Sequence, residues 1–288
     1  MNTDTLEREA EQSALSVGIP PCPAVLTGLV AEMRKDEPDF GKIAKLIGHD
    51  VALSATMLKT VNSPFYGLSQ KVGSIPQALA LLGLRNISHM VMRLLLVQAF
   101  PAGDSPLLER FWESSASTAA TLAWLARHTK KLDRDEAYTY GLFRDCGVPV
   151  MMLNFADHAE LVERATADPQ RVLSEIEYDE LGMDHATLGH EMAVSWHLSE
   201  AACLAIRHHH DYEVLNQDGS GTGTTLPRQS LAMIALGIIA ERLYQDHCGD
   251  APGTEWQRAG KAALLVAGLT EEELAGLSGD IDAVIERR

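Results

Sequence analysis

The sequence has few aromatic residues and no closely spaced cysteines. Aromatic residues make up 6% of the 288 residues, so a core has to be built mainly from Leu, Ala, Val, Ile and Met. No two of the four cysteines are close enough to form a CxxC pair, which excludes a zinc knuckle and a thioredoxin-type motif. These cysteines are Cys22, Cys146, Cys203 and Cys248. Four cysteines in a chain of this length are ordinary for a reducing compartment.

Positive charge and long apolar runs are also scarce. The chain has 24 Lys and Arg against 40 Asp and Glu, a net charge of −16. Such a surface repels phosphate backbones and anionic lipids, so neither a nucleic-acid partner nor a membrane is expected. The start, "MNTDTLEREAEQSAL", lacks the apolar stretch of a secretion signal. The most apolar stretches, "MVMRLLLVQAF" and "LAMIALGIIA", are shorter than the ~20 residues of a bilayer span, so they indicate buried helices of a cytoplasmic protein.

No segment of useful length alternates with the period of a β-strand, and helix signals dominate. Asp39 and Asp50 stand before helical patterns, while Ser74 (cap), Pro76 (first turn) and Gly83 (end) delimit another helix. Further helices are predicted over Val51–Ser63, Leu84–Phe100, Leu107–His128, Arg134–Leu142, Ala156–Ala167, His185–Trp196, Ser199–His209, Pro227–Tyr244, Glu255–Ala267 and Glu271–Leu277, with a short one at the C-terminus.

The fold class predicted from this pattern is all-α, a two-lobed multi-helix bundle. The segment "PAGDSP", Pro101–Pro106, concentrates turn residues and predicts a linker between the lobes. The predicted organisation is a lead-in over 1–17, an N-terminal helical lobe over 18–101, a second helical lobe over 106–280 and a tail over 281–288. Residues 216–225, "NQDGSGTGTT", predict a glycine-rich loop in the second lobe.

One long stretch carries a family likeness. "LSATMLKTVNSPFYGLSQKVGSIPQALALLGLRNI" resembles the signature of the HDOD domain, a bacterial signalling module. That signature has an Asn-Ser pair ending a helix, an aromatic-Gly turn, and a Ser-Ile-x-x-Ala helix that finishes in Leu-Gly. The matching residues, which have a structural role or form a partner surface, are Asn62, Ser63, Tyr66, Gly67, Ser74, Ile75, Ala78, Leu82 and Gly83.

A second stretch, "GLFRDCG", is similar to a degraded "HD-x-G" motif of the HD phosphohydrolases. With it the resemblance extends over residues 19–277. HDOD domains are all-helical relatives of the HD superfamily that usually lack its metal ligands. The resemblance therefore implies an HDOD domain over residues 18–280, with an HD-domain-like C-terminal lobe.

The HD resemblance implies four ligand positions for a catalytic metal, and most are replaced. They are an upstream His, the His-Asp doublet and a downstream Asp, and they fall here at about Ser114, at Arg144-Asp145 and at about Gly237. Arginine offers only donors and stays positively charged, so it cannot bind a metal. We therefore expect no metal and no other cofactor. Asp145 is then more easily interpreted as the partner of a salt bridge or a helix cap than as a ligand.

The histidines are better preserved than the doublet. His185-Ala-Thr-Leu-Gly189 and His209-His210-Asp211 resemble two motifs of the HD-GYP phosphodiesterases, although the Tyr-Pro that should follow the second is missing. On a helix, His208, His209 and His210 would point about 100° apart and could not all bind one ion. His209 or His210 could face His185, either as the wall of a remnant pocket or as an adventitious metal site.

Two function hypotheses follow from this resemblance. The favoured one is a non-catalytic regulatory module that binds signalling proteins, fused or partner regulatory domains, or a small ligand in the remnant pocket. A special case is the output domain of a response regulator in a two-component system, although the chain starts too close to the HDOD-like region to include a receiver domain. The alternative is a divergent metal-dependent phosphohydrolase that uses Asp145, His185, His209 and His210.

Overall fold

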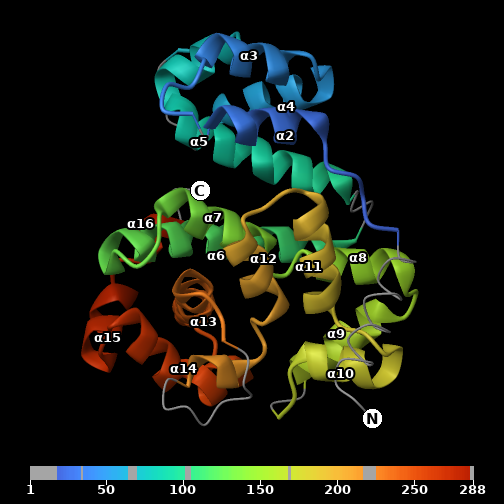
Figure 1. The fold of residues 1–288 in the computed structure, drawn as a ribbon, viewed down its shortest axis with the longest axis vertical. Coiled ribbons are helices and arrows are strands. Elements are labelled where there is room, and N and C mark those ends of the chain that lie inside the picture. Colours follow the sequence, from blue (N-terminus) through green and yellow to red (C-terminus); the bar gives the residue numbers. More distant parts are fainter. Residues whose placement is uncertain are drawn as a thin grey trace. The chain divides into compact units, whose positions relative to one another are not determined.

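The computed structural model describes residues 18–33, 35–63, 70–100, 105–167, 170–216 and 225–285. All regular structure in these ranges is helical, which confirms the all-α class (Figure 1). The chain divides into two compact units. Residues 20–104 form one, here called the N-terminal unit, and residues 105–288 form nearly all of the other, the C-terminal unit. Tyr66 and Gly67 of the HDOD signature lie outside the described residues.

The described residues of the N-terminal unit form four helices, α2 (Ala24–Met33), α3 (Phe40–Gly48), α4 (Val51–Val61) and α5 (Ile75–Ala99). Three of them begin at the residues that the sequence predicts as caps. Asp39, Asp50 and Ser74 have extended backbones, and their side chains accept hydrogen bonds from amides in the first turns of α3, α4 and α5. The caps fix where α3, α4 and α5 start, and apolar faces of all four helices pack into the core of this unit.

Gly83 interrupts α5 as the sequence predicts. Its backbone angles are φ 78° and ψ 162°, which lie outside the helical region and are readily adopted only by glycine. By length and composition, α5 is the one described helix that is apolar enough to cross a membrane. The kink divides it into residues 75–82 and 84–99, and each part is shorter than the ~20 residues of a span.

Asn62 connects the two ends of the HDOD signature. It follows α4, and its side-chain amide donates to the carbonyls of Leu58 and Val72, at 2.8 Å each. Its Oδ1 accepts from the amide of Val72, also at 2.8 Å. These bonds tie the end of α4 to the segment that leads into α5. Within the signature, Asn62 and the buried Ile75 therefore have structural contacts.

Glu32 is a buried carboxylate in α2. Its side chain is 1% exposed and contacts the ammonium groups of Lys35 at 2.7 Å and Lys42 at 2.9 Å. These two hydrogen-bonded lysines lower the pKa of Glu32 to about 2, against the opposing effect of burial. The carboxylate therefore remains charged through the whole range in which free carboxyls titrate.

We expect Glu32→Gln to lower the thermal midpoint of the full chain by several degrees at pH 7, because both lysines lose their charged partner. A carboxyl whose pKa is lowered by folding stabilises the folded state above its unfolded pKa and loses that effect as pH falls towards its folded pKa. The difference between wild type and variant should therefore be constant above about pH 5 and shrink as pH falls towards 2. Calorimetry at several pH values measures it. Glu37→Gln, at an exposed neighbour, is the control, and an equal loss there would contradict the prediction.

The C-terminal unit surrounds one apolar helix. Residues 232–240 of α13 are all buried, which confirms that "LAMIALGIIA" is an interior helix. It packs against α6, α12 and α14 among others. The helices of this unit are α6 (Pro106–Thr129), α7 (Arg134–Phe143), α8 (Gly147–Asn154), α9 (His158–Ala167), α10 (Leu173–Leu181), α11 (His185–Ser195), α12 (Glu200–Arg207), the short 3₁₀ helix η2 (Tyr212–Leu215), α13 (Arg228–Cys248), α14 (Thr254–Ala267), α15 (Glu271–Ser278) and α16 (Asp282–Ile285).

Three helices, α2, α8 and α10, lie outside the predicted ranges. In addition, α12 ends at Arg207, two residues before the predicted end, with His208 as its C-cap. His209 and His210 consequently lie in a turn and not on a helix, so the expected separation of 100° between consecutive side chains does not apply to them.

A glycine brings α8 and α11 together. A Cβ atom at Gly147 would lie 1.9 Å from the carbonyl oxygen of His185 and 2.7 Å from the amide of Gly189. Such distances are far below any van der Waals contact, so only glycine permits this approach. The contact places the turn between α7 and α8 directly beside the first residue of α11.

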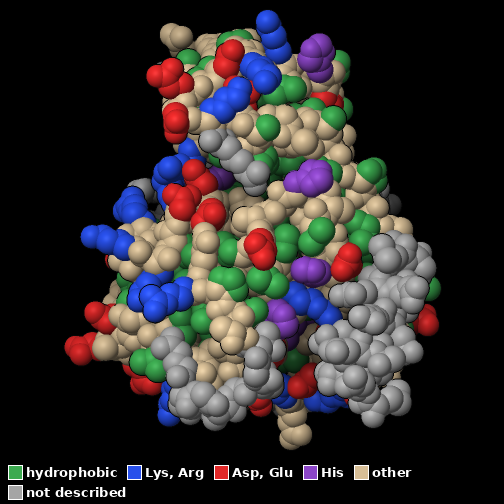
Figure 2. All heavy atoms as spheres, in the orientation of Figure 1, with side chains coloured by type: hydrophobic (Ala, Val, Ile, Leu, Met, Phe, Trp, Pro, Cys, Tyr) green, Lys and Arg blue, Asp and Glu red, His purple; other side chains and the backbone are tan. Residues whose placement is uncertain are grey.

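Acidic and basic side chains are interspersed over the face shown in Figure 2, with hydrophobic and other polar groups between them.

Candidate functional site

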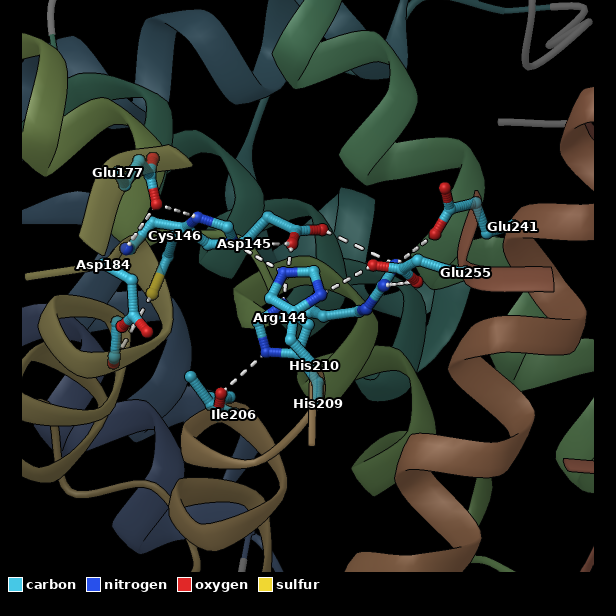
Figure 3. A network of polar contacts seen from close by, with 12 residues as sticks. Arg144, Asp145, Cys146, Glu177, Asp184, Ile206, His209, His210, Glu241 and Glu255 are labelled. Carbon is cyan, nitrogen blue, oxygen red and sulfur yellow. Dashed lines mark hydrogen bonds and ion pairs between the residues drawn. The ribbon is translucent and has the colours of Figure 1, made fainter. Parts of the chain in front are cut away.

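Four potential metal ligands meet in the C-terminal unit: Asp145, His185, His209 and His210 (Figure 3). We call this group the His–Asp cluster. Asp145 lies in the turn between α7 and α8, His185 begins α11, and His209 and His210 lie between α12 and η2. Their ligand atoms all lie within 4.8 Å of one another. The structure thus brings together the four residues that the sequence offered as a pocket or metal site.

The cluster is arranged around the Nε2 atoms of its histidines. Nε2 of His209 lies 3.2 Å from Oδ1 of Asp145, and Nε2 of His185 lies 3.7 Å from the same oxygen. Nε2 of His210 is 2.9 Å from Nε2 of His185. His185 and His209 are almost completely buried, and Nε2 of His209 makes no hydrogen bond of good geometry within the described residues.

An outer set of acceptors holds the other nitrogen of each ring. Nδ1 of His185 is 2.6 Å from Oε2 of Glu177, and Nδ1 of His210 is 2.8 Å from Oε1 of Glu255. Nδ1 of His209 is 2.7 Å from the carbonyl oxygen of Ile206. Since carboxylate and carbonyl oxygens only accept, these partners place a proton on Nδ1 of each ring. Each Nε2 is therefore directed at the centre of the cluster.

Glu177 links the cluster to a deeper histidine. It lies on α10, is fully buried, and its Oε1 is 2.6 Å from Nε2 of His158 at the start of α9. It also accepts the backbone amide of His185 at 2.8 Å. Burial alone would raise the pKa of Glu177, but His185 and His158 outweigh it and lower the pKa to about 2. A charged Glu177 thus fixes both the ring and the backbone of His185.

The charges in the cluster follow from these contacts. Burial opposes the imidazolium form of His185, but Glu177 and Asp145 outweigh it and raise the pKa of His185 to about 9. Burial would raise the pKa of Asp145, but Arg144, His209 and His185 hold it well below its usual value. Burial and the neighbouring His209 and His185 hold the pKa of His210 well below its usual value, so His210 is neutral.

Arg144 is enclosed by carboxylates beside the cluster. It is buried, and its guanidinium nitrogens lie 2.8 Å from Glu241 of α13 and 2.5 Å from Glu255 of α14. Asp145 lies 3.7 Å away. Burial and the nearby Glu255 raise the pKa of Glu241 to about 8. The positive charge of Arg144 is therefore balanced by neighbouring carboxylates.

The other two positions that the HD resemblance predicts, Gly237 and Ser114, lie on α13 and α6. A Cβ atom at Gly237 would lie 3.3 Å from the ring of Tyr140 and 3.6 Å from Cδ of Arg144, so the arginine stem occupies the space beside this glycine. Ser114 is half-buried on α6, and the hydroxyl of its neighbour Ser115 donates to the carbonyl of Leu142 at 3.1 Å.

Some sequence expectations for the site need correction. The run of histidines divides, because His209 and His210 both enter the cluster while His208 lies apart, 3.7 Å from Asp211. Glu177, Glu241 and Glu255, which surround the cluster, were not predicted at all. The only signal for them was the general rule that a metal-binding histidine donates its second nitrogen to a carboxylate or carbonyl.

A surface groove of about 630 Å³ borders the cluster. His210 lines it together with Asp184, Arg207 and Asp211, and α10 contributes Tyr178. Arg207 donates to the hydroxyl of Thr187 in the first turn of α11. Through His210, the cluster can therefore be reached from solvent.

Comparison with known proteins identifies the class to which this fold and site belong. The family model of the HDOD domain matches residues 19–212, which is more than half of the chain. The protein belongs to the HDOD family, a signal-transduction type of domain related to the HD phosphohydrolases. The resemblance seen in the sequence is thereby confirmed.

Individual relatives are distant. The chain is 26% identical over 198 residues to an uncharacterised protein of Treponema pallidum, covering 67% of this chain and 38% of that protein. It is 29% identical over 163 residues to YuxH of Bacillus subtilis, covering 57% and 36%. It is 27% identical over 158 residues to the cyclic di-GMP phosphodiesterase CdgJ of Vibrio cholerae, covering 52% and 36%. The chain thus spans little more than a third of these curated relatives.

Solved structures share the fold. An HDOD domain protein of Geobacter sulfurreducens matches with a TM-score of 0.68 at 19% identity, covering 98% of this chain and 99% of that one. A candidate signal transduction protein of Marinobacter aquaeolei matches with a TM-score of 0.79 at 19% identity, covering 99% and 65%. At this level of identity the likeness establishes the fold.

Proposed function

We propose that this protein is a non-catalytic regulatory module that acts in the cytoplasm by binding a signalling protein or a small ligand. The observation that carries the proposal is the environment of Arg144. Its guanidinium stands where the HD doublet has a metal-binding histidine, and it engages Glu241 and Glu255. A catalytic metal needs an open coordination position for the attacking water. The four remaining ligand residues could fill all positions of one tetrahedral ion, which would leave no position for that water.

The relatives support a signalling role without assigning an activity. The Vibrio cholerae relative is named a cyclic di-GMP phosphodiesterase, but the match covers 36% of it, so its activity is not attributed to the shared domain. The structural neighbour from Marinobacter aquaeolei is named for signal transduction. An output role for a receiver domain is a special case of this proposal.

Hydrolysis assays test the proposal. The full chain, supplied in turn with Mg²⁺, Mn²⁺ and Zn²⁺, is incubated with cyclic di-GMP and with bis(p-nitrophenyl) phosphate. We expect no turnover above that of the metal ion in buffer. Turnover at enzymatic rates would contradict the proposal.

A divergent metal-dependent phosphohydrolase is the second candidate, because the His–Asp cluster contains four convergent ligand atoms. The same assay separates the two candidates. Hydrolysis by the wild type that is lost in His209→Ala, and retained in His208→Ala, would establish the second candidate and exclude the first.

A further inference from the structure

The three histidines of the His–Asp cluster all have the same ring orientation relative to its centre. Each ring has its Nδ1 within 2.6–2.8 Å of a fixed acceptor, and each Nε2 faces the shared centre. The acceptors come from three different segments, α10, the end of α12 and α14. A ring held in this way by a carboxylate or carbonyl is the arrangement that orients a metal-binding histidine and raises its basicity.

We propose that the His–Asp cluster is a closed binding site for one zinc ion, with Nε2 of His185, His209 and His210 and a carboxylate oxygen of Asp145 as its four ligands. The proposal deepens the proposed function, since it takes the site as non-catalytic. A zinc ion with four protein ligands has no position left for a reactive water, so it acts structurally.

The distances suit a small ion of tetrahedral geometry. Atoms bound tetrahedrally to zinc at about 2.0–2.1 Å lie about 3.3 Å from one another. Three of the six pairwise distances among the ligand atoms are 2.9 Å, 3.2 Å and 3.7 Å, and all six are within 4.8 Å. The atoms of these three pairs therefore need to move by only a few tenths of an ångström to reach the spacing of zinc ligands.

The chemistry of the ligands selects the kind of metal. Three imidazoles and one carboxylate suit zinc and the later divalent transition metals, whereas magnesium and calcium prefer oxygen ligands. The local charge also favours a cation, because the carboxylates of Asp145 and Glu177 contact histidines of the cluster, while the Arg144 guanidinium is paired with Glu241 and Glu255. Nε2 of His209 is buried without a hydrogen bond among the described residues, which leaves it available as a ligand.

The site would connect three segments that are distant in sequence. Asp145 belongs to the turn after α7, His185 to the start of α11, and the paired histidines to the turn before η2. His210 also lines the groove of about 630 Å³. Zinc would therefore fix the turn that borders this groove. A partner or ligand that binds in the groove would then contact a turn whose conformation is already ordered.

Zinc titration of the full chain tests the inference. The protein carries no histidine tag, is stripped with EDTA, and is then loaded with zinc sulfate and desalted. We expect one zinc per chain by elemental analysis, a rise in the thermal midpoint on loading, and zinc X-ray absorption that shows nitrogen and oxygen ligands without sulfur. Magnesium chloride should produce neither retention nor a thermal shift.

The histidine run provides matched variants. His210→Ala should weaken zinc binding by more than the roughly 10–100-fold that loss of an outer partner costs. His208→Ala removes a neighbouring histidine that lies outside the cluster and should leave binding unchanged. Glu177→Gln alters an outer partner and should weaken binding by about 10–100-fold. Circular dichroism of the metal-free variants shows whether each is folded. X-ray absorption of the wild type tests the ligand set even if a variant fails to fold.

The outcomes separate this inference from the proposed function. Less than half an equivalent of zinc, or equal losses in His208→Ala and His210→Ala, would overturn the zinc site and leave the non-catalytic role intact. Zinc bound at one equivalent together with hydrolysis of cyclic di-GMP would overturn the non-catalytic role and leave the site intact. An adventitious surface ion would be retained by His210→Ala, which counts against the site.

Discussion

Replacing Arg144 with methionine is expected to lower the free energy of unfolding by about 3–5 kcal/mol, the loss typical of breaking a buried ion pair from one side. Methionine retains most of the apolar stem and removes the guanidinium. Glu241 and Glu255 then face each other and Asp145 without a cation. Urea denaturation at pH 7, followed by circular dichroism, measures the loss.

The pH dependence of this loss identifies its cause. Without the guanidinium, the pKa of Glu241, which is already raised to about 8 in the wild type, should rise further. The difference between wild type and Arg144→Met should therefore be largest above about pH 8 and shrink as pH falls below 8. Arg164→Met is the control, because Arg164 pairs with Glu180 on the exposed surface and such pairs contribute little. A loss of similar size in both variants would contradict the prediction, because the buried ion pairs of Arg144 would then contribute no more to stability than an exposed pair.

Local features of the fold were predictable from sequence, and features that depend on distant contacts were not. Asp39, Asp50 and Ser74 cap helices because a side-chain oxygen satisfies amides two or three residues away, which a short window of sequence reveals. Helix α10, "LSEIEYDEL", contains Ile176 and Leu181 among acidic residues, so its apolar pattern is weak. Its start is set by Val172 and Glu175 and not by a Ser or Asp cap.

The ligand residues of the site were predictable from local sequence, whereas the residues that hold them in place depend on distant contacts. The four members of the His–Asp cluster could be found because they stand in short motifs, "RDCG", "HATLG" and "HHHD". Glu177 could not, since nothing in its local sequence distinguishes it from the other Asp and Glu residues of the chain. Only the packing of α10 beside α9 and α11 brings it to His158 and His185. The directions of His209 and His210 depended on whether α12 ends at residue 207 or 209, which lies within the usual uncertainty of helix ends.

Gly147→Ala should produce the other large effect. The added methyl group would lie 1.9 Å from the carbonyl oxygen of His185, and its neighbours are backbone atoms, which cannot move aside as the end of a side chain could. Helices α8 and α11 would have to separate, so we expect a loss of at least about 3 kcal/mol, at the upper end of the cost of overpacking. Gly276→Ala in α15 is the matched control. Nothing lies within 4 Å of its Cβ position, so it should stabilise the protein by about 0.5–1 kcal/mol.

The same substitution tests how the His–Asp cluster is held. Gly147 follows Asp145 by two residues, and the atom that its methyl group would meet belongs to His185, so moving α8 from α11 changes the distance between two of the four proposed ligands. We therefore expect the folded fraction of Gly147→Ala to bind zinc more weakly than wild type, measured by titration at a temperature where circular dichroism shows native helix content. Gly276→Ala should bind as wild type does. If Gly147→Ala bound zinc with unchanged affinity, the approach of α8 to α11 would not be what positions the site, and the outer partners of the histidines alone would have to hold it.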